Sequence, residues 1–241
     1  MKTFFTAIIL FFTISSFAQK QDIDTIIHDP RAKQVLDHVS KRYSKFNTLR
    51  LYFQYEVFDN KDTSNRLKEQ YTGWLYVKGN DKYKLIIPNL EIFSDGVKIY
   101  SLDKKNKELN ITLYDPESDD ILTPQKLLYI YKKGFKYSYR GYARFDTKTL
   151  KNGKIVPVKR TMDIVDLYPD NPKQSPYSLV RIWIDKSTGQ IVSVKYQGKN
   201  GIDIVVDFLE EKPNINIPDL MFQYDPKRLP KGTEINDLTE E

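Results

Sequence analysis

Apolar residues near the start of the chain recur at the spacing of an α-helix. Asp29 and Pro30 have the form of a helix start, because aspartate caps helix N-termini and proline is favoured at the first helical position. The apolar positions that follow lie on one face, at intervals of three and four residues: Val35, Leu36, Val39, Tyr43 and Phe46. We therefore expect an amphipathic helix over 31–46 with one inward face.

From Leu49 the apolar period changes to two, which is typical of a strand. Leu49, Leu51, Phe53, Tyr55 and Val57 alternate with Arg50, Tyr52, Gln54 and Glu56. Further runs separated by Gly, Asn and Asp predict strands over 71–78, 82–88, 92–114, 135–142, 156–168, 177–185, 190–196 and 202–209. Turns at 94–96 and 103–106 divide 92–114 into short antiparallel strands, because Asp-Gly adopts positive φ at low cost.

One apolar segment interrupts this run of strands. Thr123 is expected to cap a second, short helix, Pro124 to begin it and Gly134 to end it. Its apolar positions are Leu127, Leu128, Ile130 and Tyr131. Together the patterns predict a mostly β fold of about ten or eleven antiparallel strands with two or three helices. A barrel with more than about eight strands is wide enough to enclose a cavity.

The first 18 residues have the features of a secretory signal peptide. Lys2 precedes an apolar run from Phe4 to Ile14, and small residues at Ser16 and Ala18 predict cleavage after Ala18. We expect one domain over 19–241. The sequence contains no cysteine, which excludes disulfides, thiolate metal sites and a lipidated Cys anchor. The expected compartment is a bacterial periplasm, with the mature chain soluble.

Charge leaves two interpretations open. The chain has 38 basic and 32 acidic residues, a formal net charge of +6, and the two signs are interspersed. They form either a solvated surface of mixed charge or a mildly basic face that approaches anionic lipid headgroups or an acidic partner. Nucleic acid is a poor fit in this compartment.

Residues for enzyme chemistry do not form a recognisable constellation. Neither His28 nor His38 has a second histidine at metal-ligand spacing, and the chain lacks a G-x-S-x-G elbow and a Gly-rich phosphate loop. Three carboxylate pairs could act in acid/base catalysis or bind a cation: Asp119-Asp120, Asp163 with Asp166, and Glu210-Glu211. With so many acidic residues in the chain, chance explains these pairs better. We favour a protein that is not an enzyme and that uses no cofactor or metal.

Aromatic residues are abundant, with 17 Tyr, 13 Phe and 2 Trp. Either they form the ordinary core of a sheet, or some of them line a lipid pocket with their hydroxyls at its mouth. From the period-two spacing of the early strands, the expected wall of an acyl-chain cavity is Leu51, Phe53, Leu75, Val77, Tyr83, Leu85 and Ile87.

Several motifs, in order, resemble the periplasmic outer-membrane lipoprotein carrier family, LolA. The run 73–78 (GWLYVK) resembles the family's G-x-L-W/Y-V-K, and 94–100 resembles its SDG followed by an aromatic strand. Residues 122–128 resemble its inserted helix, and 222–235 (FQYDPKRLPKGTEI) its closing F-x-P-P-x-G segment. The family's F-x-Q is represented by adjacent Phe53 and Gln54. The resemblance covers about 29–235.

The resemblance implies an unclosed antiparallel β-barrel with a lid of short helices, acting as a monomer. The cavity would hold the acyl chains of lipoproteins as cargo, received from an inner-membrane ABC-type lipoprotein-releasing complex and passed to an outer-membrane acceptor. The expected lid residues are Val35, Leu36, Val39, Leu127, Leu128 and Tyr131. Gly79-Asn80 stands where the family often has Arg-Pro, so lid closure by that Arg does not carry over. The alternatives are a carrier of other lipids with the same fold, or a sensor of mislocalised lipoproteins.

Overall fold

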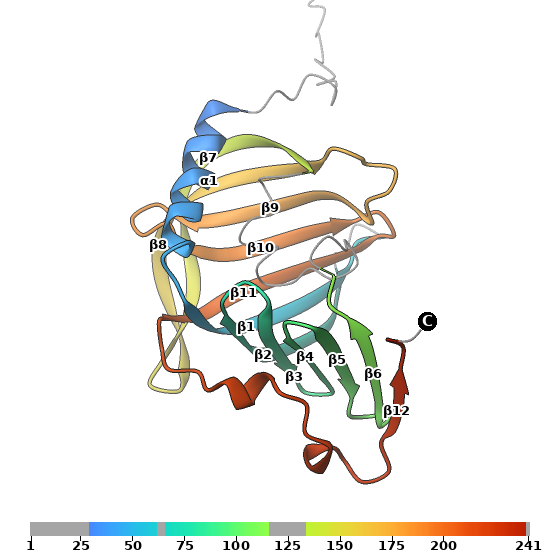
Figure 1. Cartoon of the computed structure of the whole chain (residues 1–241). Coiled ribbons are helices and arrows are strands. Elements are labelled where there is room, and N and C mark those ends of the chain that lie inside the picture. Colours follow the sequence, from blue (N-terminus) through green and yellow to red (C-terminus); the bar gives the residue numbers. More distant parts are fainter. Residues whose placement is uncertain (1–28, 62–65, 116–133, 240–241) are drawn as a thin grey trace, which may run out of the picture.

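The computed structural model describes residues 29–61, 66–115 and 134–239 (Figure 1). The helices in these ranges are α1 (Pro30–Tyr43) and the short 3₁₀ turns η3 (Asp219–Phe222) and η4 (Pro226–Arg228). The first six strands are β1 (Thr48–Asp59), β2 (Arg66–Lys78), β3 (Lys82–Ile87), β4 (Leu90–Asp95), β5 (Lys98–Asp103) and β6 (Glu108–Leu113). The others are β7 (Phe135–Lys151), β8 (Lys154–Pro169), β9 (Tyr177–Asp185), β10 (Ile191–Gly198), β11 (Ile202–Pro213) and β12 (Glu234–Asp237).

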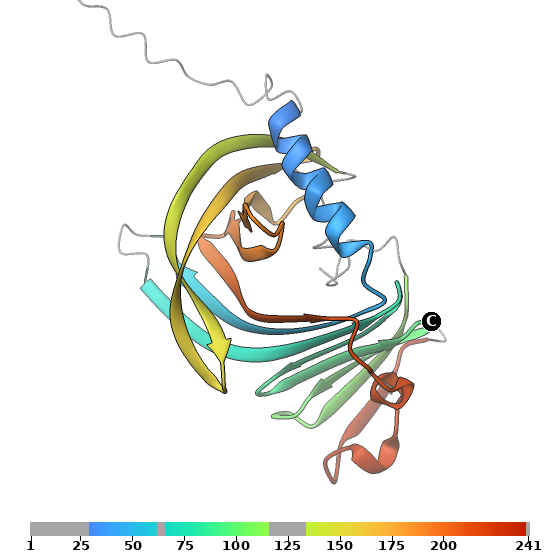
Figure 2. The same ribbon diagram turned by 90° about the vertical axis from the view of Figure 1, so that its left-hand side faces the viewer.

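All twelve strands belong to one sheet, in the order β12-β6-β5-β4-β3-β2-β1-β11-β10-β9-β8-β7. Neighbouring strands are antiparallel except β12 and β6, which are parallel. The sheet curls strongly but its two outermost strands do not pair, so it forms an open half-barrel (Figure 2). The expected mostly β, unclosed antiparallel barrel is therefore confirmed.

The strand pattern differs most from the prediction at β12 and β7, while β2 begins at Arg66 instead of 71 and β11 continues to Pro213 instead of 209. β12 was not expected as a strand; it pairs with β6 through four residues near the end of the chain. β7 continues to Lys151, well beyond the expected end at 142, and pairs with β8 as far as the Asn152-Gly153 turn. The outer part of β7 is largely exposed, so backbone pairing holds it in place and no apolar alternation reveals it in the sequence.

The predicted first helix is present as α1, and Asp29 is its N-cap. The Asp29 carboxylate accepts from the backbone N–H of Arg31 at 2.8 Å, and Pro30 occupies the first helical position. The inward face contains Ala32, Leu36, Val39 and Tyr43, all buried. α1 lies across the open side of the curved sheet (Figure 2). The second predicted helix, over 123–133, lies outside the described residues.

Polar contacts fix both ends of α1 to the sheet. At its start, the backbone N–H of Tyr139 donates to the second oxygen of Asp29 at 2.9 Å. At its end, the Tyr43 hydroxyl donates to Glu211 at 2.6 Å and accepts from the backbone N–H of Ile191 at 3.2 Å. Arg42 also pairs with Glu211. Burial and the adjacent Glu211 carboxylate raise the pKa of Tyr43 well above its ordinary value, so this hydroxyl stays a donor.

Two hydrophobic clusters lie on opposite faces of the sheet. The larger fills the inside of the curve under α1. The smaller lies on the outer face of β4 to β6, where the segment with η3 and η4 covers it, and consists of Phe93, Tyr100, Leu102, Leu109 and Ile111 with Tyr224 and Leu229 packed against them. Among the described residues, no helix is long and apolar enough to cross a membrane. The expected signal peptide lies outside them.

Candidate functional site: an apolar cavity inside the half-barrel

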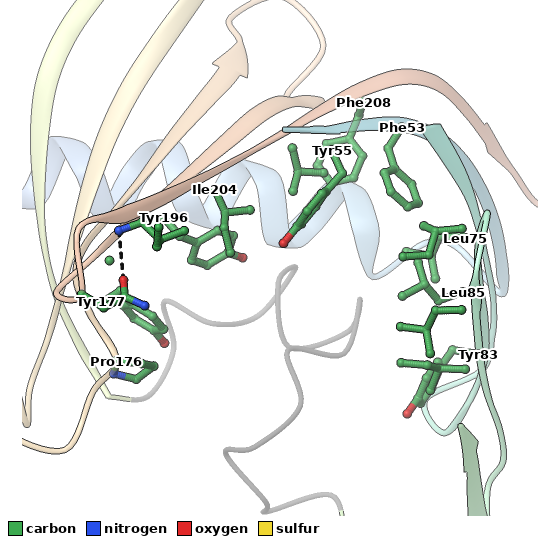
Figure 3. A pocket seen from close by; sticks show the side chains of 17 residues that line it. Phe53, Tyr55, Leu75, Tyr83, Leu85, Pro176, Tyr177, Tyr196, Ile204 and Phe208 are labelled. Carbon is green, nitrogen blue, oxygen red and sulfur yellow. Dashed lines mark hydrogen bonds between the residues drawn. The ribbon is translucent and has the colours of Figure 1, made fainter. Parts of the chain in front are cut away.

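A cavity of about 510 Å³ opens inside the half-barrel (Figure 3). Seventeen residues line it, and most of its wall is carbon. They are Phe53, Tyr55, Leu75, Tyr83, Leu85, Ile87, Leu90, Ile92, Pro176, Tyr177, Tyr196, Gly198, Asn200, Ile202, Ile204, Val206 and Phe208. This volume falls within the roughly 300–1,000 Å³ that is typical of small-molecule sites.

The wall is apolar because alternate side chains of each strand point to the inside of the curve. On β11, Ile202, Ile204, Val206 and Phe208 line the cavity, whereas Asp203, between the first two, points away from it. Asp203 is instead paired with Lys195 at 2.8 Å. Period-two patterning thus separates an apolar lining from a charged outer face.

The structure places five of the seven expected cavity residues on the wall: Phe53, Leu75, Tyr83, Leu85 and Ile87. The other two, Leu51 and Val77, are 4% and 6% exposed and belong to the same hydrophobic core, but they are not part of the lining. They lie at the ends of β1 and β2 that pair close to the chain leaving α1. The position along the strand, as well as its face, decides which residues border the cavity.

Of the expected lid residues, three lie on α1. Leu36 and Val39 are almost fully buried, and Val35 is half-buried against the core beneath the helix. None of the three is part of the cavity lining. Leu127, Leu128 and Tyr131 lie outside the described residues.

Twelve of the seventeen lining residues were not expected from the sequence. They come from β1, from β4, from the start of β9 and the residue before it, and from β10, β11 and the turn between them. A signal was present, since Ile202, Ile204, Val206 and Phe208 alternate as regularly as the early strands do. What the alternation cannot show is that β11 pairs with β1, from Leu49 opposite Pro213 to Asp59 opposite Ile202. That long-range pairing makes the two halves one wall.

A glycine shapes the wall where β1 and β2 meet. Gly73 stands opposite Phe53, and a Cβ added at Gly73 would lie 2.6 Å from the Phe53 ring and 2.6 Å from the carbonyl oxygen of Ile86. It would also lie 2.8 Å from a methyl of Ile87. These distances are shorter than van der Waals contacts allow. The Phe53 ring can therefore keep its position only because residue 73 has no side chain.

The carboxylates and the described histidine contribute nothing to the cavity wall. Asp166 is buried and receives two hydrogen bonds from Arg181, at 2.6 and 2.8 Å, while Asp163 accepts from Tyr139 at 2.7 Å. His38 lies near Gly189, outside the lining. His28, Asp119 and Asp120 are not described. In the described ranges, no three His, Asp or Glu side chains are grouped so that they could hold a metal ion.

Gly79 and Asn80 form the turn between β2 and β3, and Gly79 is held there by a backbone hydrogen bond. Gly79 has φ of 64°, and its N–H donates to the carbonyl of Asn47 at 3.0 Å. At the end of α1, Arg42 and Tyr43 make polar contacts with Glu211 on β11.

No protein-family model and no curated protein matches the sequence. Solved structures do resemble the fold. An uncharacterized conserved protein from Thermus thermophilus is 11% identical with a TM-score of 0.51, over 86% of this chain and 99% of that one. At this identity the likeness concerns the fold alone.

Two further solved structures have lower TM-scores. A LolA superfamily protein from Nitrosomonas europaea is 11% identical with a TM-score of 0.37, over 80% of this chain and 97% of that one. The structure of the MucA/MucB complex of Pseudomonas aeruginosa is 12% identical with a TM-score of 0.37, over 81% of this chain and 61% of that one.

Proposed function

We propose that this protein is a periplasmic carrier that holds the acyl chains of lipoproteins in its cavity. The observation that supports this best is the cavity of about 510 Å³ with an almost wholly apolar wall inside an unclosed barrel. Each methylene transferred from water into such a wall contributes about 0.8 kcal/mol, the same as in a membrane, so the cavity can shield an acyl chain from water at little net cost relative to the bilayer.

An open barrel suits a carrier better than a sealed one. The sheet ends at β7 and β12 without closing, and α1 lies across the open side (Figure 2). A carrier must take up its cargo and later release it, so the filled and empty states have to be close in free energy. A gap bridged by a helix can admit a chain without breaking the hydrogen bonds between strands.

The remaining parts of the proposal follow from the sequence and its resemblance. Residues 1–18 direct export as a signal peptide, and 19–241 form one carrier domain in the periplasm. The cargo is received from an inner-membrane ABC-type lipoprotein-releasing complex and delivered to an outer-membrane acceptor. The protein acts in this as a binding protein and not as an enzyme.

A pair of neighbouring residues on β3 tests the binding site. Leu85 lines the cavity, whereas Ile86 is the next residue along the strand and is not part of the lining. Leu85→Asp should lower the affinity for a fluorescent acyl probe and for a synthetic triacylated lipopeptide at least tenfold, because a carboxylate would be buried without a partner. Ile86→Asp is the matched control and should bind both ligands as the wild type does.

Both variants should be compared by circular dichroism and urea unfolding, so that binding is measured on folded protein. If folded Leu85→Asp binds the lipopeptide as tightly as the wild type, the cavity is not the acyl site. If the wild type binds phospholipid but not lipopeptide, the cargo is another lipid. Transfer of a lipoprotein between inner- and outer-membrane vesicles then tests the shuttling role.

A further inference from the structure

Two tyrosine hydroxyls in the cavity wall make no hydrogen bond to any residue that the structure describes. Tyr83 and Tyr196 both line the cavity and are 2% and 7% exposed. The hydroxyl oxygen of each is buried and makes no hydrogen bond within the part of the chain that the structure describes. Leaving a hydroxyl in an apolar setting without a partner is unfavourable. Phenylalanine would fill the same space without that penalty, so these hydroxyls call for an explanation.

The two side chains lie on opposite sides of the cavity (Figure 3). Tyr83 is on β3 and Tyr196 on β10, with β2, β1 and β11 between them in the sheet. Four strand spacings of about 4.8 Å separate them around the curved wall, roughly 19 Å in all. They are too far apart to bond to each other, and both residues border the cavity.

The chemistry of the wall restricts the ligand group that could accept from these hydroxyls. Burial raises the pKa of Tyr83 to about 12 and that of Tyr196 further, so both are neutral donors near neutral pH. Every described lining residue is uncharged, so the described part of the wall supplies no cation for a carboxylate or a phosphate. An unpaired anion in such a setting is strongly disfavoured. The matching acceptor is therefore a neutral carbonyl oxygen.

We propose that Tyr83 and Tyr196 donate hydrogen bonds to carbonyl oxygens of esterified acyl chains. The cavity thereby selects acyl esters over free fatty acids and over ether lipids of the same chain length. The inference rests on the proposed lipid-binding function and assigns its specificity to two residues. A tyrosine hydroxyl bonded to an ester carbonyl satisfies a donor that is otherwise unpaired, whereas an ether lipid leaves it without a carbonyl to bond.

The test compares a diester with a diether that lacks its carbonyls, and includes palmitate as the free fatty acid. The purified mature chain is titrated with a dipalmitoyl glycerol ester, with the corresponding dihexadecyl ether, and with palmitate. We expect the wild type to bind the diester about tenfold more tightly than the diether, or about 1.4 kcal/mol. In the Tyr83→Phe/Tyr196→Phe double variant the ratio should fall towards one, while the affinity for the diether stays the same. The single variants apportion the effect.

Tyr100→Phe is the control, because Tyr100 stacks on Phe93 in the outer cluster, and its hydroxyl donates to Asp95, away from the cavity. It should keep the wild-type ratio. The Phe variants in the cavity should fold, since the hydroxyls that they remove bond to no described residue. If the double variant keeps the wild-type ratio of diester to diether affinity, the inference is wrong and the proposed function stands. The same holds if the wild type binds palmitate as tightly as it binds the diester. Failure of the wild type to bind any of the three lipids overturns both.

Discussion

At the scale of single residues, the outer face of the sheet carries a carboxylate held between two lysines. Glu91 accepts from Lys84 at 2.5 Å and pairs with Lys104 at 3.0 Å, and its side chain is 18% exposed. Burial acts to raise the pKa of Glu91, but the hydrogen bonds from the two lysines outweigh it and lower the pKa below the ordinary value of 4.5. The charged form is therefore favoured by the folded state.

The pH dependence follows from the direction of this shift. Because the pKa is lower in the folded protein, the stabilisation is fully present above the ordinary value and is lost as the pH falls through the folded value. Glu91→Gln should lower the free energy of unfolding by about 1 kcal/mol near pH 7, allowing for the partial exposure of the lysines. As the pH falls through the folded pKa of Glu91, the variant and the wild type should converge, since the wild-type side chain then becomes neutral as well.

Urea unfolding at several pH values measures this difference. Asp146→Asn is the control, because Asp146 and Lys159 form a pair at 3.9 Å with side chains 76% and 65% exposed, which contributes little. A Glu91→Gln deficit that stays the same size as the pH falls through the folded pKa of Glu91 would contradict the assignment.

At the scale of elements, local chemistry predicted most of the strands and turns. Asp95 and Asp103 illustrate this, since each accepts from backbone N–H groups two and three residues further on, as expected for the turns after β4 and β5. The helix start at Asp29 and Pro30 was predicted for the same reason. These features depend on neighbours in sequence, so the residue types alone reveal them.

Features that depend on partners far along the chain were not predictable in this way. β12 is four residues long and has no apolar alternation, and only its pairing with β6 makes it a strand. The cavity half contributed by β10 and β11 depends on the pairing of β11 with β1. Leu51 and Val77 are likewise absent from the wall because of where α1 meets β1 and β2. The period-two spacing of a strand gives no information about that position.

The close approach of β1 and β2 leads to a prediction at this scale. Gly73→Ala should lower the free energy of unfolding by about 1–3 kcal/mol, because the added methyl meets the carbonyl of Ile86 and forces the Phe53 ring into the cavity. It should also weaken acyl-probe binding. Gly153→Ala is the control: Gly153 has φ of 74° and open space around it, so alanine there strains the turn and leaves the cavity unchanged. Equal probe affinity in Gly73→Ala and Gly153→Ala would show that the glycine does not shape the wall.

At the scale of the whole molecule, the sheet separates the cavity on one face from the smaller hydrophobic cluster on the other. Successive residues of a strand point to opposite sides, so on β4 Ile92 lines the cavity while Phe93 belongs to the outer cluster. Phe93, Tyr100 and Tyr224 stack in series, with ring centroids 4.7 and 5.2 Å apart. The chain after β11 runs beside β4 to β6 (Figure 2), and its Tyr224 and Leu229 pack against the outer cluster.

This separation predicts that stability and binding respond to different substitutions. Tyr224→Ala removes one ring from the stack, and since Tyr224 is only partly buried the free energy of unfolding should fall by about 2 kcal/mol, less than for a fully buried aromatic residue. The folded fraction should keep the wild-type affinity for the acyl probe, because the inner faces of β3 and β4 are held by their pairing with neighbouring strands. Leu85→Asp should show the reverse, with a large loss of affinity and a smaller loss of stability. Urea unfolding and probe titration of the same preparations measure both quantities. If folded Tyr224→Ala loses as much affinity as Leu85→Asp, then the outer cluster sets the shape of the cavity through the sheet and the two faces are coupled.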